Sequence, residues 1–492
     1  MEHGIWRLPR ARAMRSALLV AALAAGTLLI PAGSASAGHT DDSEALPIIF
    51  VHGGAGSAAQ YESVARRFAS NGYPEERIAA FEYNSASPAA IGAAPAGVEA
   101  LANELRAEFD VDQVNLVGHS LGTFVSNNFL SNPDRRALVS HYVGVDGAGN
   151  TTCRDVWEPD PNENIACMGI WAQPQGTRAV GSTNHSFEGQ QTHVEAATSA
   201  ESFGFQYEFF TGEEPATTNI LPEPPGEVEI SGRAVNFPQN AGVDGATLRI
   251  FEINGATGAR KAGGPLATFE IDESGDWGPV EVNGQRHYEF LLSRGEGVRE
   301  HHLYFQPFIR DSQFVRLLTS PPDSAIPTNT TLGPDHSAAV VARNREWWTT
   351  HSSGRNDVLE VGTKSPSQGD EAPVHILENV TSNGNIGVHI HDRGEDLTDP
   401  TAEPDGVSSL SIIPFFDAQP FQTGIDVFMP ATEPADGTIT FRNEPRGDAS
   451  RPQVLNIPNW ASEGHAISAN LNDYVQGINT WAQCKKLKPN PC

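Results

Sequence analysis

The stretch VNLVGHSLGTF, residues 114–124, runs from an apolar strand-like segment directly into Gly-His-Ser-Leu-Gly, and helix-compatible residues follow. Ser120 therefore lies where a strand is expected to become a helix. This is the pattern of a nucleophile elbow, in which a tight turn exposes a serine hydroxyl. Both glycines are needed because a side chain there would collide with the neighbouring strand and helix. A loose turn that happens to contain a serine is the alternative, and it leaves this context unexplained.

A second segment upstream fits the same chemistry. IIFVHGGAG, residues 48–56, reads as a buried strand followed by a loop of small residues. A serine that accepts an acyl group needs N–H donors for the oxyanion that forms on the carbonyl. The residue after the nucleophile, Leu121, supplies one donor, and a loop after an earlier strand supplies the other. We expect Gly54 to be that donor, with Ala55 as the alternative.

Three downstream histidines are candidates for the general base. His141 lies inside the strand-like segment VSHYVGV and is predicted to be structural. His185 is a competitor that the sequence leaves open. His193 precedes an amphipathic segment with aromatic residues on one face, and a loop just before the last helix would turn its ring toward Ser120. We therefore favour His193.

The acid partner follows partly by elimination. No aspartate or glutamate occurs between Cys167 and Ser186, so the strand before the histidine loop offers no carboxylate. The previous strand ends in VGVDGAG, which places Asp146 at its carboxyl end, where catalytic groups of parallel sheets converge. There it would fix the imidazole tautomer. The alternatives are the carboxylates of the loop that follows, Asp155, Glu158, Asp160 and Glu163.

The order of apolar segments predicts the architecture. Buried strands alternate with helical patterns from about residue 46 to 215, which indicates an α/β domain with a parallel sheet covered on both faces. After the proline-rich segment 219–227, short alternating stretches with turn residues predict all-β structure, of sandwich or barrel type. We expect a catalytic domain over 38–218, a β-sandwich-like domain over 226–325 and a second β-rich domain over 326–492, although one β-domain is the alternative.

Charge and the first residues indicate the compartment. The net charge of −29 over 492 residues excludes nucleic acid as a partner, because phosphates would repel this surface. Arginines precede the apolar run 17–32, and the small residues 35–37 follow it, which predicts a signal peptide over 1–37 and secretion. The alternative, a membrane anchor, is disfavoured because the run is short for a span. No later segment is apolar enough to cross a membrane.

Four cysteines agree with an oxidising compartment. Pairing between sequence neighbours is the simplest of the three possible connectivities, which would join Cys153 to Cys167 and Cys484 to Cys492. Two polar clusters, at 300–302 and 389–396, are expected to be packed or solvated patches of β-structure rather than metal sites. The segment 85–97 and the Cys153–Cys167 loop are candidates for a lid.

The region 46–212 resembles the α/β-hydrolase lipases, specifically the small bacterial secreted lipases. FVHGGAG, LVGHSLG and GQQTHVEAATSAESF carry the resemblance. It implies ester hydrolysis by Ser120, His193 and Asp146, with no metal and no organic cofactor. Those small lipases usually carry the acid one strand later, whereas the position of Asp146 resembles that in pancreatic-type lipases. The layout of a hydrolase followed by a large β region resembles lipases that act on long acyl chains.

The sequence thus predicts a secreted serine carboxylic ester hydrolase, most consistent with a lipase that acts on triacylglycerols or long-chain acyl esters. A lipid–water interface is the place where such a lipase is expected to meet its substrate. Two alternatives stay open. One is an esterase for polymeric or polysaccharide-linked esters, with the β region holding the polymer. The other is a surface-binding protein whose hydrolase-like core is inactive.

Overall fold

The computed structural model describes residues 45–149, 165–174, 183–349, 356–380, 384–393, 406–418 and 420–492. The predicted signal peptide, Cys153 and the alternative carboxylates of the 155–163 loop lie outside these ranges. Within the described ranges, no helix combines the length and the hydropathy that a membrane span requires.

A six-stranded parallel sheet forms the N-terminal part, in the order β2-β1-β3-β4-β5-β6. Apart from the edge strand β6, its strands are short and mostly buried, as expected for a parallel sheet covered on both faces. They are β1 (Ile48–Val51), β2 (Ile78–Phe81), β3 (Val114–His119), β4 (Val139–Val145), β5 (Ala166–Trp171) and β6 (Thr183–Ser186). The predicted α/β class is thereby confirmed.

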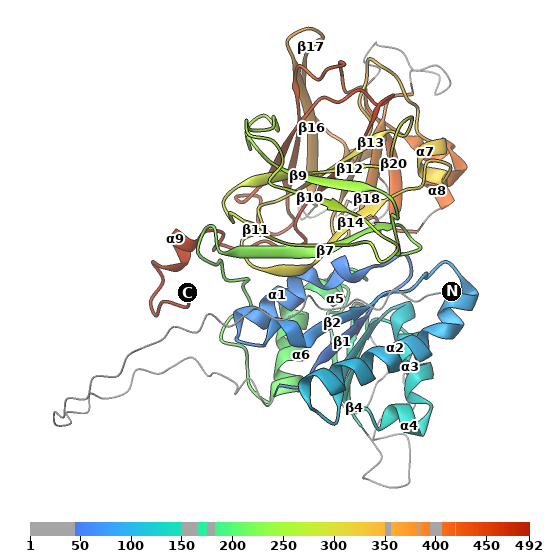
Figure 1. The fold of residues 1–492 in the computed structure, drawn as a ribbon, viewed down its shortest axis with the longest axis vertical. Coiled ribbons are helices and arrows are strands. Elements are labelled where there is room, and N and C mark those ends of the chain that lie inside the picture. The colour runs from blue at the N-terminus through green and yellow to red at the C-terminus, as the bar shows by residue number, and fades with distance from the viewer. Residues whose placement is uncertain are drawn as a thin grey trace, which may run out of the picture.

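Helices cover the two faces of this sheet with separate apolar cores (Figure 1). On one face Phe68 and Phe203 pack edge to face, 5.1 Å between ring centroids. On the other, Leu101 and Phe129 share the second core. The helices are α1 (Glu62–Ser70), α2 (Pro88–Phe109), α3 (Leu121–Leu130), α4 (Pro133–Arg136), α5 (Glu195–Thr198) and α6 (Ala200–Thr211).

Helix α2 begins seven residues earlier than the apolar periodicity from Pro95 suggested. Ser87 caps it by accepting a hydrogen bond from the N–H of Ala90, and Pro88 occupies the first turn, where its missing N–H costs nothing. Most of the segment 85–97 that we considered as a lid therefore forms the first turns of this helix. Its small residues concealed the helix because they carry no apolar stripe.

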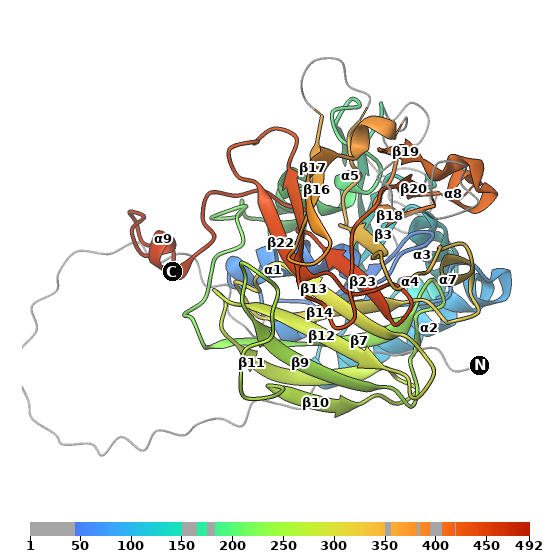
Figure 2. The same ribbon diagram turned by 90° about the horizontal axis from the view of Figure 1, so that it is seen from above.

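The described residues of the C-terminal part form three β-sheets, which confirms the predicted all-β region. A nine-stranded sheet has the order β10-β9-β12-β13-β23-β15-β18-β20-β19, and two further sheets have the orders β11-β7-β14, with β8 beside β7, and β17-β16-β21-β22. Figure 2 shows β10, β9, β12 and β13 side by side. The strands are β7 (Val228–Asn236), β8 (Ala241–Gly242), β9 (Thr247–Ile253), β10 (Ala267–Glu270), β11 (Asp276–Val282), β12 (His287–Ser293), β13 (Glu300–Phe305), β14 (Ser312–Thr319), β15 (Ala339–Ala342), β16 (Val358–Ser365), β17 (Gly369–His375), β18 (Gly387–His391), β19 (Ser408–Ser409), β20 (Gln422–Asp426), β21 (Thr438–Glu444), β22 (Gln453–Pro458) and β23 (His465–Asn470).

The nine-stranded sheet crosses the boundary that the sequence suggested near residue 325. Strand β13 pairs in parallel with β23, 165 positions later in the register Glu300↔His465. Two apolar cores nevertheless lie on either side of that boundary, one mostly within 228–317 and the other mostly within 339–471. The division into two β-domains stays a prediction. Short helices α7 (Ala325–Thr328), α8 (Pro414–Ala418) and α9 (Trp481–Cys484) complete this part.

A buried ion cluster joins the hydrolase part to the β region. Glu82, directly after β2, pairs with Arg233 of β7 at 2.8 Å and with Arg316 of β14 at 3.0 Å, and all three side chains are at most 2% exposed. The carboxylate also accepts a hydrogen bond from the N–H of Ala58. Burial by itself would raise the pKa of Glu82, but Arg316 and Arg233 hold it well below its ordinary value.

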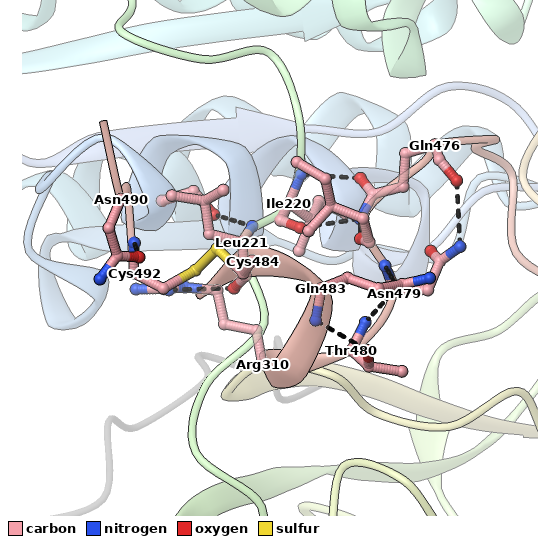
Figure 3. Close-up of a disulfide and its surroundings, with 12 residues drawn as sticks. Ile220, Leu221, Arg310, Gln476, Asn479, Thr480, Gln483, Cys484, Asn490 and Cys492 are labelled. Atoms are coloured by element: carbon pink, nitrogen blue, oxygen red, sulfur yellow. Dashed lines mark hydrogen bonds between the residues drawn. A yellow bond between two sulfur atoms is a disulfide. The ribbon is translucent and has the colours of Figure 1, made fainter. Parts of the chain in front are cut away.

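The C-terminal segment closes back on the linker between the two parts (Figure 3). Gln476 uses both ends of its amide on Ile220, accepting from its N–H and donating to its carbonyl, each at 2.8 Å. Beyond it, Cys484 and Cys492 form a disulfide. The linker is therefore held in place by hydrogen bonds to the C-terminal segment.

Candidate active site

Ser120 occupies a strained turn between β3 and α3. Its backbone has φ 53° and ψ −121°, a combination that non-glycine residues rarely adopt. A Cβ on Gly118 would lie 2.7 Å from Ser126 Oγ, and a Cβ on Gly122 would lie 2.1 Å from the carbonyl oxygen of Val51. Both glycines are therefore required by close packing, as the sequence suggested.

Asp146 and His193 form a hydrogen-bonded pair. Nδ1 of His193 lies 2.6 Å from Oδ2 of Asp146, and Oδ1 of Asp146 accepts from the N–H of Ala172 at 3.1 Å. Burial by itself would raise the pKa of Asp146, but the hydrogen bonds from His193 and Ala172 hold it below its ordinary value. The carboxylate is thus ionised near neutral pH, so Nδ1 carries the proton and Nε2 of His193 is left as an acceptor.

His119, the residue before Ser120, holds the loop that carries His193 through a hydrogen bond to its backbone. His119 Nε2 lies 3.0 Å from the carbonyl oxygen of His193, and its Nδ1 lies 2.8 Å from Gln60 Nε2. Burial lowers the pKa of His119 to about 3, so the ring is neutral. The amide of Gln60 donates to Nδ1, which leaves Nε2–H to donate to His193. This role of His119 was missing from the sequence analysis.

Glu346, a glutamate of the β region, holds the same loop by accepting hydrogen bonds from it. Glu346 is 2% exposed, and its carboxylate accepts from Thr192 Oγ1 at 2.6 Å, from Val194 N at 2.6 Å and from Glu195 N at 3.0 Å. These three donors flank His193 on both sides. Sequence reasoning missed Glu346, because nothing near position 346 indicates a partner about 150 residues earlier.

The two predicted oxyanion donors, Gly54 and Leu121, differ from Ala55 in the partners of their N–H groups. Leu121 is the first residue of α3, so its N–H has no partner within the helix. We find no acceptor for the N–H of Gly54 among the described residues, whereas the N–H of Ala55 donates to Ser85 Oγ at 2.9 Å. Gly54 is therefore better suited than Ala55 to bind an oxyanion.

The oxyanion loop is also held from the β region. Asn240, in the turn between β7 and β8, donates to the carbonyl oxygen of Gly56 at 2.9 Å, and its Nδ2 lies 3.3 Å from His52 Nε2. The ring of His52 stacks on Tyr83 with 4.5 Å between centroids. Both loops that flank Ser120 are thus fixed by residues beyond 226.

Ser120, His193 and Gly54 line one cavity of about 250 Å³. The β region lies over the carboxyl ends of the hydrolase strands and supplies much of the lining. From the β region, the ring of Phe421 stacks on that of His193, with 6.0 Å between centroids. Further lining residues include apolar side chains and two histidines, together with charged residues: Phe237, Phe305, Leu318, Ile326, Val340, His301 and His389, and Arg66, Arg299, Arg316 and Asp473.

The other two candidate histidines lie elsewhere. His185 on β6 stacks on Phe205, 3.8 Å between centroids, and His141 on β4 contacts Phe209 and pairs with Asn115. Neither lines the cavity.

The parallel sheet, the strained serine turn and the added β region define an α/β-hydrolase with a large C-terminal extension. Family models agree with this class. A class 2 lipase model matches residues 45–130, which contain the oxyanion loop and the serine turn, and a lipase C-terminal domain model matches 226–322. A third model, described as a C-terminal domain, matches 325–475. The chain is thus a lipase-like hydrolase followed by additional C-terminal domains.

Solved structures with similarity to part of the chain include several hydrolases. Lipase B of Aspergillus fumigatus is 14% identical over 38% of this chain and 57% of its own, with a TM-score of 0.27. A lipase-esterase related protein of Clostridium acetobutylicum is 12% identical over 35% of this chain and 97% of its own, at 0.26. A Bacillus cereus carboxylesterase is 11% identical over 34% and 91%, at 0.23. No curated protein matches the chain.

Proposed function

We propose that this protein is a secreted serine carboxylic ester hydrolase, a lipase for long-chain acyl esters. The observation that carries the proposal is that His193, which pairs with Asp146 at 2.6 Å, lines the same cavity as Ser120 in its strained turn. The lipase models support the reaction class. The N-terminal apolar run after several arginines supports export.

The residues suit an acyl-enzyme mechanism. Nε2 of His193 takes the proton of Ser120 while the serine oxygen attacks the ester carbonyl. The N–H groups of Gly54 and Leu121 stabilise the oxyanion, and Asp146 stabilises the imidazolium that forms. His193 then protonates the leaving alcohol. Water attacks the acyl-enzyme with His193 as the base, which releases the acid and restores the serine.

The cavity lining supports a long acyl chain as the substrate. Apolar residues such as Phe237, Phe305 and Leu318 line much of the cavity beyond Ser120, so an acyl chain would leave water as it binds. Burial of each methylene group contributes about 0.8 kcal/mol, so the preference should grow with chain length until the cavity is filled.

The test combines active-site labelling with a series of substrates. A fluorophosphonate should label the full chain at Ser120, and Ser120→Ala should abolish labelling and lower kcat by at least about 10⁴-fold. Ser131→Ala, an exposed serine after α3, is the matched control and should react normally. We expect kcat/KM to rise from acetyl to long-chain esters, emulsified triacylglycerol included.

Two results would contradict the proposal. Folded wild-type protein that resists labelling would favour the surface-binding alternative. Labelling without any gain from longer chains, together with release of acetate from an acetylated glycan or of monomers from an insoluble polyester, would favour the esterase for polymeric esters.

A further inference from the structure

Two histidines and a glutamate meet on the face of the nine-stranded sheet that points away from the cavity. Glu300 and His302 lie on β13, and His465 lies beside Glu300 on β23. Their ligand atoms lie within 4.8 Å of one another. The intervening His301 pairs with Ser468 and lines the cavity on the other face, as strand alternation requires.

The tautomer of His302 is fixed by a buried carboxylate. Glu289, which is fully buried, accepts two hydrogen bonds from the guanidinium of Arg260, at 2.5 and 2.9 Å, so it is ionised. Its Oε1 lies 2.5 Å from His302 Nδ1. Nδ1 therefore carries the hydrogen, and Nε2 of the neutral ring presents a lone pair.

His465 is held in the same way. Its Nε2 lies 2.9 Å from Oε2 of Glu433 and donates its hydrogen to that carboxylate, which leaves Nδ1 facing His302. His302 Nε2 and His465 Nδ1 face each other at 2.8 Å. Two lone pairs at this distance repel each other unless a cation lies between them. The carboxylate of Glu300 completes the group.

We propose that Glu300, His302 and His465 bind a divalent transition-metal ion of the zinc type. Imidazole nitrogens and a carboxylate are ligands that zinc prefers, and separating the two facing nitrogens by about 0.5 Å gives the spacing of tetrahedral ligands at about 2.1 Å. Both histidines donate their remaining N–H to a carboxylate, which is the usual support for metal-bound imidazole. The ring of Trp460 stacks on that of His302, with 4.5 Å between centroids, and covers one face of the imidazole.

The ion has a structural role. It connects β13, within the lipase C-terminal domain match, to β23, within the third match, across more than 160 residues of chain. Because the ligands converge only in the folded chain, binding stabilises the folded state in proportion to the logarithm of free metal concentration. The Ser120 cavity lies on the other face, so hydrolysis does not require the ion. This assignment differs from our expectation of a packed patch at 300–302.

Metal content and thermal stability test the proposal on the full chain. We expect wild-type protein, exposed to Zn²⁺ and dialysed, to retain one zinc per chain by elemental mass spectrometry. Chelation with phenanthroline should lower Tm by several degrees, and added Zn²⁺ should restore it. Co²⁺ bound in place of zinc should give visible absorption bands of low-symmetry coordination.

Variants separate metal binding from folding. His465→Gln and Glu300→Gln, which keep size and polarity, should lose the zinc and the response of Tm to Zn²⁺ while keeping esterase activity at low temperature. His375→Gln, a half-buried histidine on β17, is the control and should retain one zinc. Wild-type protein that retains no metal, with Tm unchanged by Zn²⁺ and Co²⁺, would overturn the proposal and show that the two rings share a proton.

Discussion

At the scale of residues, the geometry around Ser120 depends on very few side chains. The turn itself is fixed by glycines, because any Cβ at 118 or 122 would collide with Ser126 or with the backbone of β1. The ring of His193 is oriented by one carboxylate, that of Asp146. Asp146 has φ 40°, directly after β4, which turns its side chain toward the histidine loop. Strain therefore accumulates where the proposed chemistry takes place.

Asp146→Asn should lower kcat by about 10⁴-fold while the fold is kept, because an amide favours the wrong imidazole tautomer. The measurement is steady-state hydrolysis of a soluble ester, with circular dichroism to check the fold. Asp134→Asn, at an exposed position in α4, is the matched control. A kcat within tenfold of wild type would contradict the role of Asp146 and favour a carboxylate of the 155–163 loop as the acid.

At the scale of elements, the loop that carries His193 is clamped between two parts of the chain. His119 holds its carbonyl group, and Glu346 accepts three hydrogen bonds from the residues around it. Glu195 in the following helix pairs with Arg345 and Arg446 of the β region. A helix as short as α5 is not stable by itself, so these contacts are needed to keep the loop that carries His193 in place.

Glu346→Gln should lower kcat by about 10- to 100-fold with a smaller change in KM, because an amide cannot accept from all three donors and the imidazole loses its alignment. Labelling by a fluorophosphonate should slow in parallel. Glu378→Gln, an exposed glutamate of the same region, is the control. Unchanged kcat with a lowered Tm alone would show that Glu346 only stabilises the fold.

At the scale of the whole molecule, the two parts are joined by charges as well as by apolar contact. Glu82→Ala should destabilise the protein by about 3 to 5 kcal/mol, because Arg233 and Arg316 would be left buried without a counter-ion. Denaturant unfolding measures the loss, and Glu99→Ala at a half-exposed surface pair is the control. A loss below 1 kcal/mol would mean that water or other residues compensate the two arginines.

The dependence of stability on pH should have a maximum at about pH 4.5. The folded pKa of Glu82 is lowered, so its contribution is complete above the unfolded value of about 4.5 and is lost as pH falls below it. Burial and the nearby Asp311 raise the pKa of Glu75 to about 7, and burial raises the pKa of Asp473 to about 6. These two groups favour folding when protonated, so stability falls as pH rises from about 4.5 through 7.

Glu75→Gln tests the alkaline side of this profile. At pH 8 the variant should have a higher Tm than wild type, because the amide has no charge to desolvate, and at pH 5 the two should differ little. Glu76→Gln, the exposed neighbour, should show no such dependence on pH. An equal shift at both pH values would contradict the assignment.

The sequence alone determined the features that depend on contiguous residues. The apolar runs at 48–51 and 114–119 must be buried strands, and the pattern Gly-His-Ser-Leu-Gly between a strand and a helix indicates the serine turn. The α/β class and the all-β region could therefore be predicted. The catalytic roles of Ser120, Asp146 and His193 stay predictions, although the structure places all three together.

Only the tertiary structure showed which distant side chains complete the site. Glu346, Asn240 and Phe421 approach the hydrolase loops across 150 or more residues, and His302 meets His465 only because β13 and β23 are neighbours in one sheet. No periodicity or motif in the sequence indicates such partners, because the role of a buried polar group can be seen only from the group that it contacts in the folded chain. Chain order specified the strands and turns, and three-dimensional packing decided which charges and rings meet.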